Sequence, residues 1–212
     1  PRILTVSFTP TLVDDSVAVA LTATSLDVAV PTGLKLGNIV LLFIASEDAD
    51  AHTFASADFT LLGSQVTNGN LRTRVGWKRF AGETGNYTIT TGAVTVDEIC
   101  AIVAGFKNID PDLTLEGTAT SNDNTSPYST PAVLPTYNNS MIIGAYFRTD
   151  NVATTEPTGW TALSSAGTNM LIKAAYKSLT TPASTTGDFT AASDPTSGTL
   201  WALSLIPTQI AF

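Results

Sequence analysis

The second half of this chain repeats the first about 100 residues later, and this duplication constrains the fold more than any other feature. Residues 70–78 (NLRTRVGWK) align with 169–177 (NMLIKAAYK), and residues 59–64 (FTLLGS) align with 160–165 (WTALSS). Further along, 85–88 (GNYT) corresponds to 186–190 (TGDFT), and 99–104 (ICAIVA) corresponds to 200–205 (LWALSL). Repeats of about 20 to 50 residues indicate solenoids or propellers, so a doubling near 100 predicts two matched sets of strands in one larger fold.

The chain is built from short runs rich in Val, Ile, Thr and aromatic residues, separated by Gly, Asn, Asp and Pro. This pattern predicts an all-β protein. We expect strands near 3–8, 12–22, 38–45, 59–64, 70–80, 86–90 and 97–106, and a second set near 113–118, 140–147, 160–165, 169–177, 187–191 and 199–206. The polar stretch 118–135 contains three prolines, which cannot donate to a central ladder. It is predicted to be a linker that crosses the surface.

The predicted strands are of two kinds. In 71–78, Leu71, Val75 and Trp77 alternate with polar residues, which indicates a strand that is buried on one face. The runs 39–44 and 99–106 are instead apolar on both faces, so each needs a second cover. That cover could be the N-terminal segment, a loop or another protomer.

These features together predict one domain over residues 1–212. Its fold is expected to be an all-β, two-sheet antiparallel sandwich of jelly-roll type, built from two internally repeated strand sets at about 37–112 and 139–206. The alternative is two separate halves, each of about 100 residues and immunoglobulin-like.

Composition excludes several classes of function. With 10 Lys and Arg against 18 Asp and Glu, the net charge is -8, which argues against binding to nucleic acid through phosphates. No apolar run approaches the roughly 18 residues of a membrane span. Only 13% of residues are charged, against about 25% in an ordinary soluble domain, as in many secreted modules and virion proteins. No signal peptide is visible at the start, so synthesis in a reducing host cytoplasm is expected.

The residues that could carry catalysis are few. Cys100 lies in an apolar run and is interpreted as a buried small hydrophobe. His52 is the only histidine, so no zinc site or familiar triad can be assembled from sequence, and it is interpreted as an exposed loop residue.

Carboxylate clusters are the remaining chemical signal. Asp48 with Asp50, or Asp97 with Glu98, could form the pair that a glycosidase needs. Glu47, Asp48 and Asp50 could alternatively supply oxygen ligands to Ca²⁺, although the spacing matches no EF-hand. Solvated surface carboxylates on an acidic protein are the favoured interpretation of both clusters. We therefore predict no catalytic residue, no cofactor and no metal.

Three groups of residues are candidates for contact with a partner. A basic stripe could dock an acidic protein surface, small apolar residues on the second face of strand 97–106 could contact another layer, and one tryptophan could contact a glycan. These residues are Arg72, Arg74 and Lys78 in the stripe, Ile99, Ala101 and Val103 in the strand, and Trp160 for the glycan. Trp77 and Trp201 are interpreted as core residues because their strand faces are otherwise apolar.

Five motifs resemble those of a known group of proteins. They are 37–44 (GNIVLLFI), 59–64 (FTLLGS), 75–79 (VGWKR), 85–90 (GNYTIT) and 104–110 (AGFKNID). This arrangement resembles the β-sandwich, jelly-roll-like modules of tailed-phage virion proteins, which act as capsid decoration or cement proteins or as fibre modules. The resemblance covers about 37–112, with a weaker echo over 139–206, and implies a virion setting without implying an active site.

The sequence therefore predicts a non-enzymatic virion structural protein, most consistent with a capsid-surface decoration or cement protein of a tailed bacteriophage. Its expected partners are other virion subunits, either the major capsid protein or fibre and tail proteins, and further copies of itself in a homo-oligomer. Neither nucleic acid nor membrane is an expected partner. The alternative is a carbohydrate- or receptor-binding module of a tail fibre or cell-surface protein.

Overall fold

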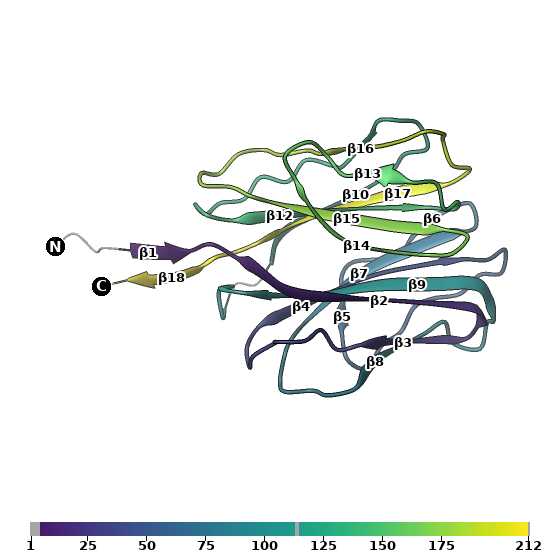
Figure 1. The fold of residues 1–212 in the computed structure, drawn as a ribbon, viewed down its shortest axis with the longest axis horizontal. Coiled ribbons are helices and arrows are strands. Elements are labelled where there is room, and N and C mark those ends of the chain that lie inside the picture. Colours follow the sequence, from purple (N-terminus) through teal and green to yellow (C-terminus); the bar gives the residue numbers. More distant parts are fainter. Residues whose placement is uncertain (1–4, 113–114, 212) are drawn as a thin grey trace.

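The computed structural model describes residues 5–112 and 115–211, in which every regular element is a β-strand. All of the strand pairs described are antiparallel, as predicted for an all-β chain. Figure 1 shows the strands stacked in layers, with two large sheets face to face and a smaller sheet outside each.

The first half of the chain forms one large sheet and its outer cover. The large sheet has the order β2–β9–β4–β7–β5, and β6 also pairs with β7. The outer cover is the pair β3–β8. The bounds are β2 Thr11–Ala23, β3 Ser25–Ala29, β4 Ile39–Glu47, β5 Thr60–Leu61, β6 Val66–Asn68, β7 Leu71–Arg79, β8 Asn86–Thr90 and β9 Val96–Lys107.

The second half forms a matching pair of sheets. Its large sheet has the order β10–β17–β12–β15–β14, and its outer sheet has the order β11–β16–β13. The bounds are β10 Leu115–Asn122, β11 Tyr128–Ser129, β12 Met141–Arg148, β13 Thr154–Thr155, β14 Thr161–Ala166, β15 Leu171–Ser178, β16 Asp188–Ala191 and β17 Gly198–Leu205. Read across the sheets, β2, β9, β4 and β7 occupy the same places as β10, β17, β12 and β15.

The two ends of the described chain meet in a two-stranded ribbon. β1 (Thr5–Phe8) pairs with β18 (Thr208–Ala211), with Val6 opposite Ile210. Figure 1 shows this ribbon projecting from one end of the layered body.

The inner faces of the two large sheets share one core. Ile39, Leu41 and Phe43 of β4 pack in the same cluster as Ile143 of β12 and Leu203 of β17. Burial of apolar area at about 25 cal/mol per Å² makes such a cluster the main source of cohesion between the halves. The prediction of two sheets over a common core therefore describes the inner layers.

The outer layers correct the prediction of a sandwich with only two sheets. Val40, Leu42 and Ile44, on the other face of β4, pack in a second cluster with Leu26 of β3 and Tyr87 of β8. A third cluster lies under the outer sheet of the second half, around Tyr128, Tyr146 and Phe189. Both faces of the doubly apolar strands are thus covered by the chain itself. The predicted strands β8 and β16 lie over them, joined by the short strands β3, β11 and β13, which the sequence pattern did not reveal.

The predicted linker 118–135 is also corrected. β10 begins at Leu115 and pairs with β17, and β11 contributes the fully buried Tyr128 to the outer sheet. β10 lies at the edge of its sheet, where several of its Thr and Ser side chains meet solvent. This polar segment therefore forms an edge strand that is stabilised by backbone pairing.

Candidate interaction surface

The strand β2 has an exposed apolar stripe along a free edge. β2 pairs with β9 on one side and, within 5–112 and 115–211, has no strand partner on the other. Val17 is 44% exposed, Val19 37% and Leu21 51%. Val17 and Val19 lie opposite Ile102 and Cys100 of the shared core. The stripe therefore continues the inner face of the first large sheet beyond the region that the second half covers.

The two aspartates of β2 are already engaged in the chain's own structure. Asp14 accepts hydrogen bonds from the backbone N–H and the hydroxyl of Thr32, at 2.8 and 2.6 Å. Asp15 accepts from the backbone N–H of Ser164 in β14 at 2.6 Å and from its hydroxyl at 3.1 Å. A bulge interrupts the β2–β9 register between Leu12 and Asp14. This part of β2 has features by which natural sheets protect an edge, whereas 16–23 (SVAVALTA) has no charge or proline.

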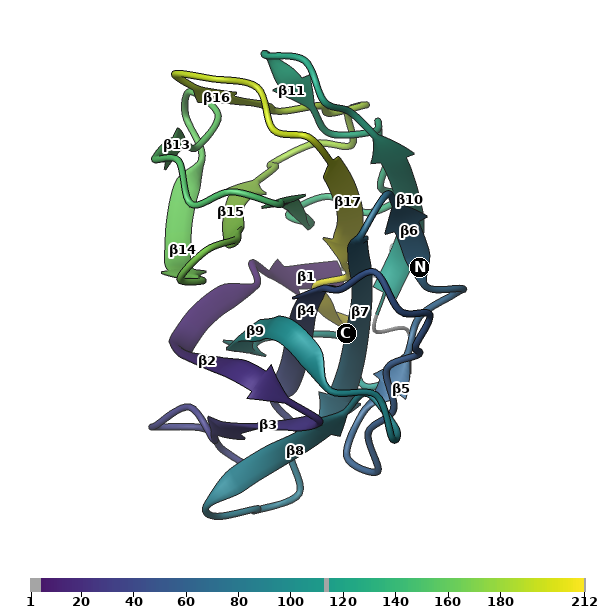
Figure 2. The same cartoon turned by 90° about the vertical axis from the view of Figure 1, so that its right-hand side faces the viewer.

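β14 is the free edge of the second large sheet and lies on the same side of the molecule. Figure 2 shows β2 and β14 together on one side, opposite β10 and β6. Residues 161–166 (TALSSA) are uncharged. We call β2 residues 16–23 together with β14 the β2/β14 seam. It consists of two adjacent, uncharged strand edges in a chain of net charge -8.

The sequence pattern predicts a strand over 12–22 but does not indicate that this strand lies at the edge of a sheet, so the seam is not predicted from sequence. The alternation of Val, Ala and Leu in 17–21 was the available signal. Edge position depends on which distant strands pair, so alternation alone does not reveal it.

The small apolar residues predicted to contact a partner are buried within the chain. Ile99, Ala101 and Val103 are fully buried in the cluster between β9 and the β3–β8 layer. The expectation that they face a partner is corrected, because β3 and β8 already occupy that face of the sheet.

The predicted basic stripe is bound internally as well. The buried Arg72 donates to the carbonyl oxygens of Asp48 and Asn70, at 2.6 and 3.0 Å. Arg74 donates to the carbonyl of Gly63 at 2.8 Å. These contacts direct both guanidinium groups to the chain's own loops.

Lys78 of the same stripe also has internal partners. Its ammonium lies 2.5 Å from a carboxylate oxygen of Glu83 and 4.9 Å from the ring centroid of Tyr87. The three cations therefore stabilise the first half and do not form a free basic surface.

Trp160 lies at the edge of a hollow in the outer layer of the second half. The residue is 9% exposed and packs beside Gly187, where an added Cβ would come within 2.8 Å of the indole. The hollow is about 380 Å³, and Lys177, Glu156 and Asp188 also line it. The indole is thus largely a core group that presents one edge to a polar cavity.

The first half has a hollow at the corresponding place. It is about 430 Å³ and is lined by Ser56, Asp58, Thr88 and neighbouring residues. Phe59, the counterpart of Trp160, is buried and packs edge-on against Tyr87 with ring centroids 4.9 Å apart.

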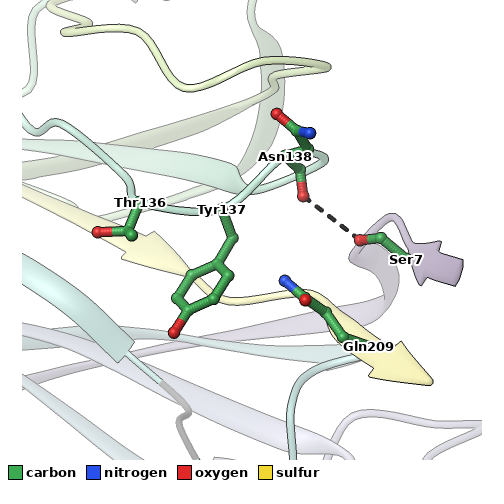
Figure 3. Close-up of a pocket in the computed structure, with 5 residues that line it drawn as sticks. All are labelled: Ser7, Thr136, Tyr137, Asn138 and Gln209. Atoms are coloured by element: carbon green, nitrogen blue, oxygen red, sulfur yellow. Dashed lines mark hydrogen bonds between the residues drawn. The ribbon is translucent and has the colours of Figure 1, made fainter. Parts of the chain in front are cut away.

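A further hollow of about 310 Å³ lies at the base of the terminal ribbon. Figure 3 shows the side chains of Tyr137 and Gln209 beside it, with the Ser7 hydroxyl donating to the carbonyl of Asn138 at 3.3 Å. Its lining is polar and contains no Asp, Glu, Lys, Arg or His, so it offers hydrogen bonds without a charged group.

His52 is buried, which corrects its interpretation as an exposed loop residue. Its Nδ1–H donates to the carbonyl of Asp50 at 3.0 Å, so Nε2 accepts from the hydroxyl of Ser46 at 2.5 Å. Gln65 holds the loop down by donating to the carbonyl of His52 at 2.8 Å. Burial lowers the pKa of His52, which favours the neutral ring.

The Ser46–His52 pair has the contact of a nucleophile and its base, but the Ser46 side chain is fully buried. Catalysis would need a substrate atom within reach of both groups. This pair is therefore a structural hydrogen bond that closes the outer core.

The carboxylates of the two sequence clusters have separate structural roles. Asp48 accepts from the backbone N–H groups of Asp50 and Asp97, at 2.6 and 3.1 Å. Glu98 is buried and accepts two backbone hydrogen bonds from the second half. Among residues 5–112 and 115–211, no group of three or more His, Cys, Asp or Glu side chains is arranged to hold a metal ion.

Comparison with known protein families, curated proteins and solved structures finds no match for this chain. The portion of the chain that the structure describes contains no helix capable of crossing a membrane.

Proposed function

We propose that this chain is a non-enzymatic structural protein of a virion surface, of the capsid decoration or cement type of tailed bacteriophages. It would act by docking β edges and faces onto neighbouring subunits. The observation that carries the proposal is the β2/β14 seam, since exposed apolar edges are sites where another chain adds. The setting rests on the resemblance of the five sequence motifs to virion modules.

We also propose that the chain is an internal duplication in which two repeated strand sets build one sandwich of jelly-roll type. The matching strand orders β2–β9–β4–β7 and β10–β17–β12–β15 support this reading. Each half then supplies one large sheet to the shared core and keeps its small sheet outside. Such an arrangement resists deformation, which suits a shell-reinforcing role.

The side chains that could carry catalysis form hydrogen bonds within the protein, which supports a function without catalysis. Ser46 and His52 bond to one another beneath the surface, and Asp48 and Glu98 bind backbone N–H groups. Carboxylates and imidazoles committed in this way stabilise turns and leave no reacting pair open to a substrate.

The proposed function can be tested on purified particles of a phage whose genome encodes the chain, by mass spectrometry and electron cryomicroscopy. We expect the chain in fixed stoichiometry with the capsid protein and density for its layered sheets on the outside of the head. Purified particles that lack the chain would overturn the proposal. Density on the tail would retain the structural role and reject the capsid location.

A second candidate function is glycan binding in the hollow beside Trp160. It is favoured because an indole edge, Lys177 and Asp188 converge on one cavity, and polar groups around an aromatic are typical of small-ligand sites. A glycan array with the wild-type protein and the K177A and D188A variants tests it. Binding lost in both variants, and kept in the surface variant K35A, would support this function; no binding by the wild type would reject it.

A further inference from the structure

We infer that a second copy of this chain docks on the β2/β14 seam by antiparallel pairing of β2 with β2, with Val19 on the two-fold axis. This inference rests on the proposed function, because it names the partner of the same seam. The result would be a symmetric dimer in which the first large sheet continues from one copy into the other.

The sequence of β2 is self-complementary in this register. With Val19 opposite itself, Val17 lies opposite Leu21 of the other copy, and Ala18 lies opposite Ala20. Directly opposite side chains on one face of an antiparallel pair contact each other. The exposed side chains of Val17, Val19 and Leu21 from the two copies thus form one continuous row of six, in which each side chain is partly covered by its neighbours.

The charge pattern selects this register. Centred on Val19, the paired segment 16–22 contains no charged residue. A shift that centres the pair on Val17 would place Asp15 opposite Val19 and bury a carboxylate that already bonds to Ser164. Because desolvation of an ion is costly, the shifted register is disfavoured.

The second half leaves room for the pairing. β14 contacts β2 through Ser164 and Asp15, four residues from the proposed axis. At about 3.3 Å per residue this is roughly 13 Å along the strand. An antiparallel two-fold places the two Asp15 contacts at opposite ends of the paired segment, so the two β14 strands lie apart.

A second copy fits the seam better than a partner recognised by charge. The segment offers backbone N–H and C=O groups, aliphatic side chains and no ion. An identical segment satisfies each of these features, and an isologous interface requires that the same patch serve both copies. Away from the seam the acidic surfaces of two copies repel, which favours a closed dimer over open association.

Sedimentation velocity of the full chain tests the inference at micromolar concentrations. We expect the wild type to be a dimer and V19K to be a monomer, because V19K places two ammonium groups on the axis. L36K is the matched control, since Leu36 is 76% exposed and lies outside the paired segment 16–22, beside Val13 near the other end of β2. We expect L36K to remain dimeric. Circular dichroism melting of each variant monitors folding.

A cysteine variant tests the register independently. Opposite residues of an antiparallel pair have Cα atoms about 4.5–5.5 Å apart, within the range of a disulfide. Oxidised V19C is therefore expected to form a covalent dimer, and L36C to remain monomeric. A wild-type monomer throughout, a V19K dimer or equal cross-linking by both variants would each overturn the inference.

Different experimental results would reject the proposed function and the proposed dimer. If V19K is monomeric and still assembles onto phage particles, the dimer stands and the seam is shown to serve self-association. If the wild type is monomeric but is found on particles, the dimer is rejected and the structural role survives. Absence from particles with dimerisation intact rejects only the virion role.

Discussion

Glu98 of β9 accepts a hydrogen bond from the backbone N–H of Asn169 at 2.7 Å, across the junction between the two halves of the chain. Its second oxygen accepts from the N–H of Thr168 at 2.6 Å, and the residue is almost fully buried. One carboxylate of the first half thus holds the turn between β14 and β15 of the second.

Glu98→Ala is expected to destabilise the protein by about 2–4 kcal/mol, because it removes a charged acceptor from two part-buried backbone hydrogen bonds. Glu98→Gln retains one acceptor oxygen and should cost less. Urea unfolding followed by tryptophan fluorescence measures both. A cost below about 0.5 kcal/mol for the alanine variant would show that water replaces the carboxylate.

Thr73 is expected to provide a second hydrogen-bonded link between the two halves of the chain. Its hydroxyl oxygen accepts from the indole N–H of Trp201 at 3.0 Å and lies 3.1 Å from the hydroxyl of Thr199. Thr73→Val should cost about 1–3 kcal/mol, since a buried N–H loses its acceptor. Thr73→Ser keeps the hydroxyl and serves as the control. Equal stability of the valine and serine variants would contradict the role of this hydrogen bond.

A fragment of residues 1–112 is expected to aggregate or to form a molten state. Its inner face would expose Leu41, Phe43 and Ile102, which pack against the second half in the intact chain, and apolar patches of this kind promote association. Solubility and heteronuclear NMR spectra of the fragment measure the outcome. A soluble monomer that unfolds cooperatively would show that each half folds alone.

The stability of the protein is expected to depend on the ionisation of Glu47. Burial, followed by the nearby charges of Glu98 and Asp97, raises the pKa of Glu47. A carboxyl pKa raised on folding means that the folded state binds the proton more tightly. The contribution of Glu47 to stability therefore decreases as pH rises from the ordinary glutamate pKa through the raised value.

Glu47→Gln should consequently raise the melting temperature at pH 7, and the gain should shrink as the pH falls toward 4. Asp14→Asn is the control of opposite sign, because the hydrogen bond from the Thr32 hydroxyl leads the contributions that lower the pKa of Asp14. Its stabilising effect is present above the ordinary aspartate pKa and is lost on acidification, so Asp14→Asn should destabilise at pH 7. A Glu47→Gln variant less stable than the wild type at pH 7 would contradict this sign.

The thiol of Cys100 is expected to be unreactive in the folded protein. Burial, together with the charge of Glu98, raises its pKa, and the side chain is fully enclosed by the shared core. A thiol reagent at pH 8 should modify it only at the rate of unfolding. Cys100→Ser should cost more than Cys100→Ala, because the serine buries a hydroxyl. Rapid labelling of native protein would contradict the burial of this strand.

The sequence by itself determined the class of fold and the positions of the longer strands. Alternation and apolar runs are local, so 71–79 and 96–107 could be identified as strands without knowledge of their partners. The same reasoning placed Trp201 and Cys100 in the core, where the structure confirms them. Both residues lie in long strands, β9 and β17, whose apolar runs are recognisable from the local sequence alone.

The tertiary structure alone decided what covers each face and which edges stay open. β3, β11 and β13 are only two to five residues long, and such short segments carry too few alternations to be recognised. The burial of Glu98 depends on hydrogen bonds to the turn at 168–169, about 70 residues away in the chain, which comes near only when the two large sheets stack. The burial of His52 depends on a loop that folds back so that the ring meets Ser46. The open edge of β2 follows from the pairing of β9 with β4, a contact between residues about 50 to 70 positions apart that no local pattern encodes.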